Sequence, residues 1–139
     1  MMDLAAVLKH SIHLACQRSS KFDYQMIAFV HPDAMDCAQP LESVGYQVLI
    51  RETPVNMSTI PNKKFVQRVT SPGSGCCREK EFLKLYSYTL TDYPIVVHLD
   101  IDTLLLKPLD ALFSAMIQPD QSSTKHVPFA MWNLSLIHI

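Results

Sequence analysis

Two aspartates separated by one residue, Asp100 and Asp102, are the side chains of this sequence best suited to chemistry. They follow directly on residues 95–99, which are apolar apart from one histidine. In an extended segment, residues two apart face the same side, so both carboxylates are expected to face one ligand. Two neighbouring carboxylates repel each other unless a cation lies between them. Oxygen ligands of this kind favour Mg²⁺ or Mn²⁺, and a diphosphate would supply further ligands.

A simpler alternative is that Asp100 and Asp102 only cap the turn into the next segment, because D-x-D taken alone is common by chance. The context favours a metal site, since an apolar strand that runs straight into two acids leaves them without a basic residue nearby in the sequence. His98, inside the apolar run, is expected to be a core or interface residue and not a ligand.

The elements that must position these acids are read from apolar spacing and from turn residues. They follow in this order: a helix over residues 4–16, a strand over 25–30, a helix over 36–44, a strand over 46–51, a loop over 53–75, a helix over 78–90, a strand over 95–99 and a helix over 109–116. Strands separated by helices imply right-handed crossovers and a mainly parallel sheet. The predicted fold class is therefore α/β, and in such sheets ligands bind beyond the carboxyl ends of the strands.

Apolar faces and end signals support three of these helices. The first is predicted to have Asp3 as its N-cap, and the second to end at Gly45. Pro108 is placed at the start of the last helix. The expected apolar faces are Leu4, Val7, Leu8, Ile12 and Ala15 on the first helix, and Phe82, Leu85, Tyr86 and Thr89 on the helix over 78–90.

Composition excludes several classes of protein. A chain of 139 residues suits one domain, and 48% hydrophobic with 18% charged residues is a globular mixture. A net charge of −1 indicates no nucleic-acid partner. No apolar stretch is long enough for a membrane span, and no signal peptide is recognised. The four cysteines, Cys16, Cys37, Cys76 and Cys77, lack zinc-site spacing.

A composite pattern surrounds the two acids. It runs from Phe82-Leu83-Lys84-Leu85 through Leu90-Thr91-Asp92-Tyr93 and the apolar run to Asp100-Ile101-Asp102-Thr103-Leu104-Leu105-Leu106, and closes with Asp110-Ala111-Leu112-Phe113. This stretch, about a quarter of the chain, resembles the glycogenin-like glycosyltransferases, family eight of the GT-A fold. Those enzymes carry F-x-K-L, L-T-x-Y, an apolar strand, D-x-D-T-L-x-L and D-x-L-F. The composite is far more specific than D-x-D alone.

The resemblance implies a mainly parallel, Rossmann-like GT-A sheet that is flanked by helices and binds a nucleotide sugar. It implies metal-dependent transfer of a hexosyl group from a nucleoside-diphosphate sugar, UDP-linked, to an acceptor hydroxyl with retained configuration. The acceptor would be a glycan, a protein or a small molecule. By this resemblance Asp102 binds Mn²⁺ (or Mg²⁺) directly, and Asp100 contacts the metal and the donor ribose. Lys84 matches the basic position that reaches the donor sugar and diphosphate.

The sequence departs from the family pattern at both ends. The family begins with a base-contacting strand where this chain begins with a helix, and H-x-x-G-x-x-K does not follow Asp102. Residues 1–133 are therefore expected to form a partial GT-A domain that is inactive by itself, with its acceptor-side residues missing. Residues 134–139, Leu-Ser-Leu-Ile-His-Ile, are similar to a translated sequencing adapter and are expected to be non-native. The compartment, cytoplasm or Golgi lumen, is left open.

Two other functions stay open. A haloacid-dehalogenase-like phosphatase also has an apolar strand entering D-x-D, with the first acid as nucleophile. In that family a threonine stands two residues after the second acid, whereas Thr103 follows Asp102 immediately. The other is a non-catalytic domain that binds a sugar nucleotide, because a fold does not determine a function.

Overall fold

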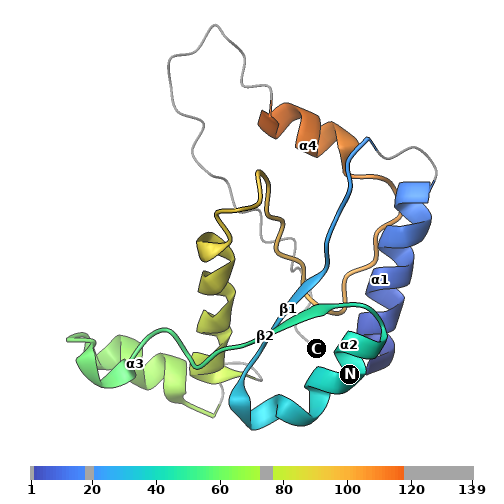
Figure 1. Ribbon diagram of the computed structural model, residues 1–139. Coiled ribbons are helices and arrows are strands. Elements are labelled where there is room, and N and C mark those ends of the chain that lie inside the picture. The colour runs from blue at the N-terminus through green and yellow to red at the C-terminus, as the bar shows by residue number, and fades with distance from the viewer. Residues whose placement is uncertain (1, 18–20, 73–76, 118–139) are drawn as a thin grey trace, which may run out of the picture. The chain divides into compact units, whose positions relative to one another are not determined.

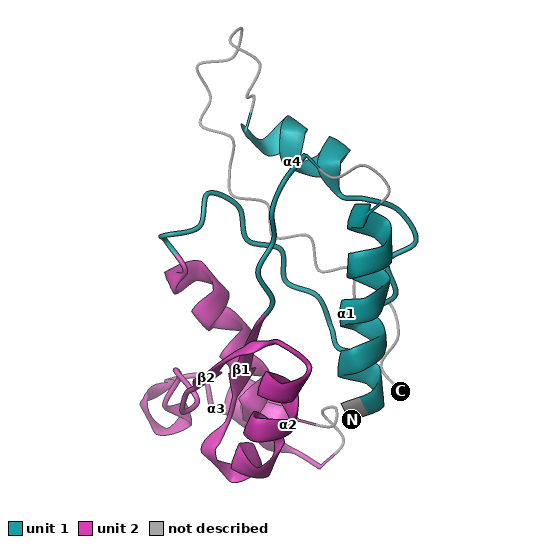
Figure 2. Cartoon of the chain, turned by 45° about the vertical axis from the view of Figure 1, so that its right-hand side comes forward, with its two compact units in different colours: residues 1–26, 91–136 teal, residues 27–90, 137–139 magenta. Residues whose placement is uncertain are grey.

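The computed structural model describes residues 2–17, 21–72 and 77–117 of the chain. The chain divides into two compact units, which Figure 2 colours separately. Of the described residues, unit 1 comprises 2–17, 21–26 and 91–117, and unit 2 comprises 27–72 and 77–90. The predicted domain limit at residue 133, the adapter-like residues 134–139 and Cys76 lie outside the described residues.

Unit 2 is built on a parallel pair of strands, β1 (Ile27–Val30) and β2 (Gln47–Ile50), marked in Figure 1. Ile27 lies opposite Gln47 and Val30 opposite Ile50. Both predicted strands are confirmed, each shorter than expected. The crossover between them consists of the 3₁₀-helix η1 (Pro32–Cys37) and the helix α2 (Ala38–Ser43), so the helix predicted over 36–44 is confirmed as well.

The predicted end of α2 at Gly45 is a Schellman motif. The N–H of Gly45 donates to Glu42 O at 2.8 Å, and the N–H of Tyr46 donates to Leu41 O at 3.1 Å. Gly45 has φ of 86°, a left-handed conformation that a residue without Cβ adopts readily. Leu41 and Tyr46, the two positions whose apolar side chains accompany this motif, are both buried. The motif thus reverses the chain and leads it directly into β2.

The segment predicted as a loop over 53–75 contains two short helices, so that prediction is wrong in part. They are η2 (Met57–Thr59) and α3 (Lys63–Thr70). Asn56 and Asn62 are their N-caps, with side-chain oxygens that accept from the N–H groups of Ser58 at 3.0 Å and Phe65 at 3.1 Å. The prolines of the segment suggested a loop, but asparagine is also among the preferred N-cap residues. The caps were the signal that the sequence reading missed.

A helix does follow over Arg78–Thr89, as predicted, but it is a 3₁₀-helix, η3. With three residues per turn, side chains three apart lie in one row, so the expected 3.6-residue stripe does not form. Leu85 of that stripe is 42% exposed, whereas Ser87 is buried. Within unit 2, η3 lies against β1, where the rings of Phe29 and Tyr86 are 5.7 Å apart between centroids.

Unit 1 begins with α1 (Met2–Gln17), which confirms the helix predicted over 4–16. Its buried apolar residues are Ala5, Leu8, Ile12 and Ala15, whereas the expected face included Leu4 and Val7, which are 45% and 52% exposed. The buried face is rotated about the helix axis relative to the predicted face, so that part of the prediction is wrong. Asp3 is not an N-cap but lies in the first turn, where its negative charge interacts favourably with the positive end of the helix dipole.

The strand predicted over residues 95–99 is not formed. Within the described residues this segment is irregular and belongs to no ladder, and the sheet has two strands. An apolar run shows that a segment is suited to burial, but a strand also needs a neighbour that takes up its N–H and C=O groups. The architecture is therefore helices with a small parallel sheet, compatible with α/β. The Rossmann-like GT-A sheet remains a prediction.

The last described element is α4 (Asp110–Ile117), which confirms the helix predicted over 109–116. It starts two residues after Pro108, so the proline precedes the helix and is not its first residue. Within unit 1, Asp110 Oδ1 accepts a hydrogen bond from the Lys21 N–H. Phe22 and Phe113 make an edge-to-face contact with 5.5 Å between ring centroids.

None of the helices within the described ranges combines the length and apolarity needed to cross a bilayer.

Replacing Gly45 tests the Schellman motif. Gly45→Ala should lower the free energy of unfolding by about 1 to 2 kcal/mol, because a Cβ is disfavoured in the left-handed region. Gly45→Asn is the matched control and should lose less, since asparagine visits that region readily. Urea unfolding monitored by circular dichroism measures both. Equal stability of the alanine and wild-type proteins would contradict the assignment.

Candidate functional site

Asp100 and Asp102 lie in a tight turn and not in an extended segment. The N–H of Thr103 donates to Asp100 O at 3.0 Å, which leaves Ile101 and Asp102 at the centre of the turn. The expectation that both acids face the same side because the chain is extended is therefore wrong. The simpler alternative, that the two acids cap the turn into the next segment, expected a turn here, and the observed turn is closed by the backbone carbonyl of Asp100. The chemistry of the two carboxylates has to be judged from their surroundings.

The two carboxylates have different surroundings. The side chain of Asp100 is 20% exposed, and its Oδ1 lies 3.6 Å from His98 Nε2. Asp102 is exposed, and its carboxylate makes no hydrogen bond or ion pair with another described residue. The site thus offers one carboxylate held against the protein and one that faces solvent.

The donor set suits a hard divalent cation with ligands from elsewhere. Among the described residues, no group of three or more His, Cys, Asp or Glu side chains is arranged to hold a metal. Such a closed cage is not required for Mg²⁺, which proteins usually bind through one or two carboxylates, waters and substrate phosphates. Asp100 and Asp102 are two carboxylates on one turn, which is the number of protein ligands that this open mode of binding uses.

Lys84, the third predicted site residue, belongs to η3 in unit 2, whereas the two acids belong to unit 1. Its Nζ lies 2.8 Å from Oε2 of Glu81, which is three residues earlier in the same 3₁₀-helix. The two side chains are 26% and 33% exposed, so the pair is partly shielded from solvent. Lys84 is therefore not the solvated lysine that its sequence position alone would indicate, and Glu81 competes with any anionic ligand for it.

A cluster that the sequence reading missed lies at the carboxyl ends of β1 and β2. His31 directly follows β1, and its side chain is 13% exposed. Its Nδ1 accepts a hydrogen bond from the Asp33 N–H at 3.2 Å, which caps η1, and its Nε2 lies 3.4 Å from Glu52 Oε2. Lys80 of η3 pairs with the carboxylate of Asp33. The signal was available, since His31 and Glu52 stand just after the two predicted strands.

Lys80 also changes the acidity of its partner. Its hydrogen bond and its positive charge hold the pKa of Asp33 below the usual value for an aspartate, and His31 acts weakly in the same direction. A carboxylate whose pKa is lowered on folding stabilises the folded state above its unfolded pKa. This stabilisation is lost as the pH falls through the folded pKa. Because Asp33 is exposed, solvent screens the pair and the contribution is small.

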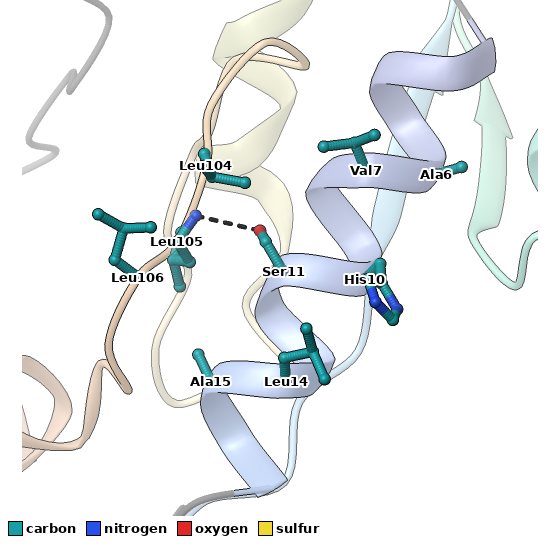
Figure 3. Close-up of a pocket in the computed structure, with 9 residues that line it drawn as sticks. All are labelled: Ala6, Val7, His10, Ser11, Leu14, Ala15, Leu104, Leu105 and Leu106. Carbon is teal, nitrogen blue, oxygen red and sulfur yellow. Dashed lines mark hydrogen bonds between the residues drawn. The ribbon is translucent and has the colours of Figure 1, made fainter.

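An apolar cavity of about 490 Å³ lies within unit 1, between α1 and residues 104–106. Figure 3 shows that Ser11 links the two segments, because its Oγ accepts the Leu105 N–H at 3.0 Å. The same hydroxyl donates to Leu8 O at 2.7 Å. None of Lys84, Asp100 and Asp102 lines this cavity. The cavity lies where the chain that leaves the acidic turn runs along α1.

Comparison of the chain with protein-family models, with curated proteins and with solved structures gave no match in any of the three. Function is therefore argued from the residues of the chain and their surroundings.

The pairing of Lys80 with Asp33 is tested by titration. Lys80→Met should raise the pKa of Asp33 towards its usual value, because the hydrogen bond and the charge are both removed. NMR of the side-chain carboxyl carbons over the acid range measures it. Lys64→Met, an exposed lysine of α3, is the matched control and should leave the Asp33 pKa unchanged. An unchanged Asp33 titration in the Lys80 variant would rule the pairing out.

Proposed function

We propose that the chain is part of a metal-dependent glycosyltransferase that transfers a hexosyl group from a nucleoside-diphosphate sugar, UDP-linked, to an acceptor hydroxyl. The observation that carries the proposal is the pair Asp100 and Asp102 within the composite pattern described above. A partly buried carboxylate and an exposed one on a tight turn supply the oxygen donors that Mn²⁺ or Mg²⁺ takes. The glycosyltransferase assignment itself comes from the resemblance.

In this proposal Asp100 and Asp102 hold the cation and Lys84 approaches the donor diphosphate. When bound, the cation would neutralise the charge that grows on the diphosphate as the sugar leaves it. Asp100 is suited to a fixed ligand, because its side chain is packed against the protein. Asp102 is suited to a ligand that closes on the cation from the solvent side. Lys84 would have to leave Glu81 and bind phosphate oxygens instead. The two negative charges of a diphosphate would attract its ammonium group more strongly than the single charge of one carboxylate.

The two alternatives make different demands on the same acids. In a haloacid-dehalogenase-like phosphatase, Asp100 would attack phosphorus and hydrolyse a generic phosphate ester. The contact of Asp100 with His98 and its low exposure limit the access that such an attack needs. A non-catalytic domain would bind the sugar nucleotide through the same cation and transfer nothing. The Lys84–Glu81 pair does not separate this domain from the transferase, since either function requires the diphosphate to displace Glu81 from Lys84.

Binding of UDP in the presence of Mn²⁺ tests the proposal. Calorimetry on the folded wild-type chain should show UDP affinity that depends on Mn²⁺. Asp102→Asn should weaken it by at least about tenfold, which is about 1.4 kcal/mol, because one charged ligand is lost. Asp92→Asn removes another exposed acid of unit 1 and should leave the affinity unchanged.

Two outcomes would overturn the proposal. One is a folded wild-type chain, judged by circular dichroism, that binds UDP equally with and without Mn²⁺ or not at all. The other is hydrolysis of a simple phosphate ester that Asp100→Asn abolishes, which would select the phosphatase. A full-length version that binds UDP through Mn²⁺ and shows no transfer with any hexosyl donor would select the binding domain.

A further inference from the structure

His98 and Asp100 form a partly buried pair at the proposed metal site. Their side chains are 19% and 20% exposed, and His98 Nε2 lies 3.6 Å from Asp100 Oδ1. The Nε2 atom itself is inaccessible to solvent, and its contact with Asp100 Oδ1 is at ion-pair distance and is not a hydrogen bond. A carboxylate that is largely withdrawn from water needs polar groups around it, because desolvation of a charge is costly. His98 is one such group, because its Nε2 lies beside the carboxylate of Asp100.

The local backbone explains why only one of the two acids has this neighbour. Residues 95–100 precede the turn, and the side chains of His98 and Asp100, two residues apart on this irregular stretch, contact each other. The turn closed by the Thr103 N–H then redirects the chain, so Asp102 is exposed. The histidine therefore acts on the first acid of the pair and not on the second.

We propose that His98 is a positioning residue that fixes the orientation of the Asp100 carboxylate for the cation. This inference rests on the proposed function, because it assigns His98 a role at that same site. The Nε2 atom is buried beside the carboxylate, so this nitrogen is not open to the cation. Partners of this kind, behind the ligands of a metal, typically contribute 10- to 100-fold to metal affinity.

The test compares two replacements of His98. His98→Phe keeps a ring of similar size and removes the nitrogen, so the Mn²⁺ affinity of the UDP-loaded chain should fall about 10- to 100-fold. His98→Gln keeps a polar group at a similar reach, so it should restore affinity to within about threefold of wild type, well inside that range. Electron paramagnetic resonance of free Mn²⁺, at a single pH, measures the affinity, and thermal unfolding is recorded in parallel.

Val97→Ala is the matched control, because it removes part of a half-buried apolar side chain one residue away. It should lower thermal stability and leave Mn²⁺ affinity unchanged. A purely structural His98 would behave in the same way, so equal Mn²⁺ affinity of the His98→Phe and wild-type proteins would overturn the inference. Equal weakness of the phenylalanine and glutamine variants would overturn it too. A wild-type chain that binds no Mn²⁺ with UDP is a different result, because it removes the proposed function itself.

Discussion

The parallel pairing of β1 and β2 is the constraint on which unit 2 depends. Parallel strands cannot be joined by a tight hairpin, so the chain has to return to the starting edge through a crossover. η1 and α2 make that crossover, and the Schellman motif at Gly45 turns the chain into β2. Both strands then end at the same edge. His31 and Glu52 meet there for this reason, although they are far apart in sequence.

In unit 1, a side-chain hydrogen bond joins two segments that are far apart in sequence, with no strand ladder between them. The chain after the acidic turn runs along α1, and the Ser11 hydroxyl takes up the Leu105 N–H while donating to Leu8 O. One serine on an otherwise apolar face thus joins a helix to a segment without secondary structure. Because this contact lies just beyond Thr103, it helps to determine where the turn that carries Asp100 and Asp102 is held. The packing of α1 and the geometry of the candidate site are therefore linked.

Burial divides the chemistry of the two acids. Asp100 is packed beside His98 and suits a fixed, oriented ligand, whereas Asp102 faces solvent and suits a ligand that completes the shell when a substrate arrives. This arrangement agrees with the open coordination that Mg²⁺ and Mn²⁺ take in phosphate-binding sites. The Lys84–Glu81 pair has the opposite character, because both charges are already compensated before any diphosphate is present. The proposed function requires Lys84 to give up its ion pair with Glu81 and to pair with the diphosphate instead.

The sequence by itself determined the features that depend on near neighbours. Periodicity and turn residues located α1, β1, α2, β2 and α4. Gly45 marked its turn because the turn depends on the φ of that one residue. Tertiary structure decided whatever needs a distant partner. Among the described residues no strand lies beside residues 95–99 to take up their backbone groups, and the face that α1 buries depends on what packs against it. The unequal burial of Asp100 and Asp102 is of the same kind, since a turn and a neighbouring imidazole, not their spacing, set it.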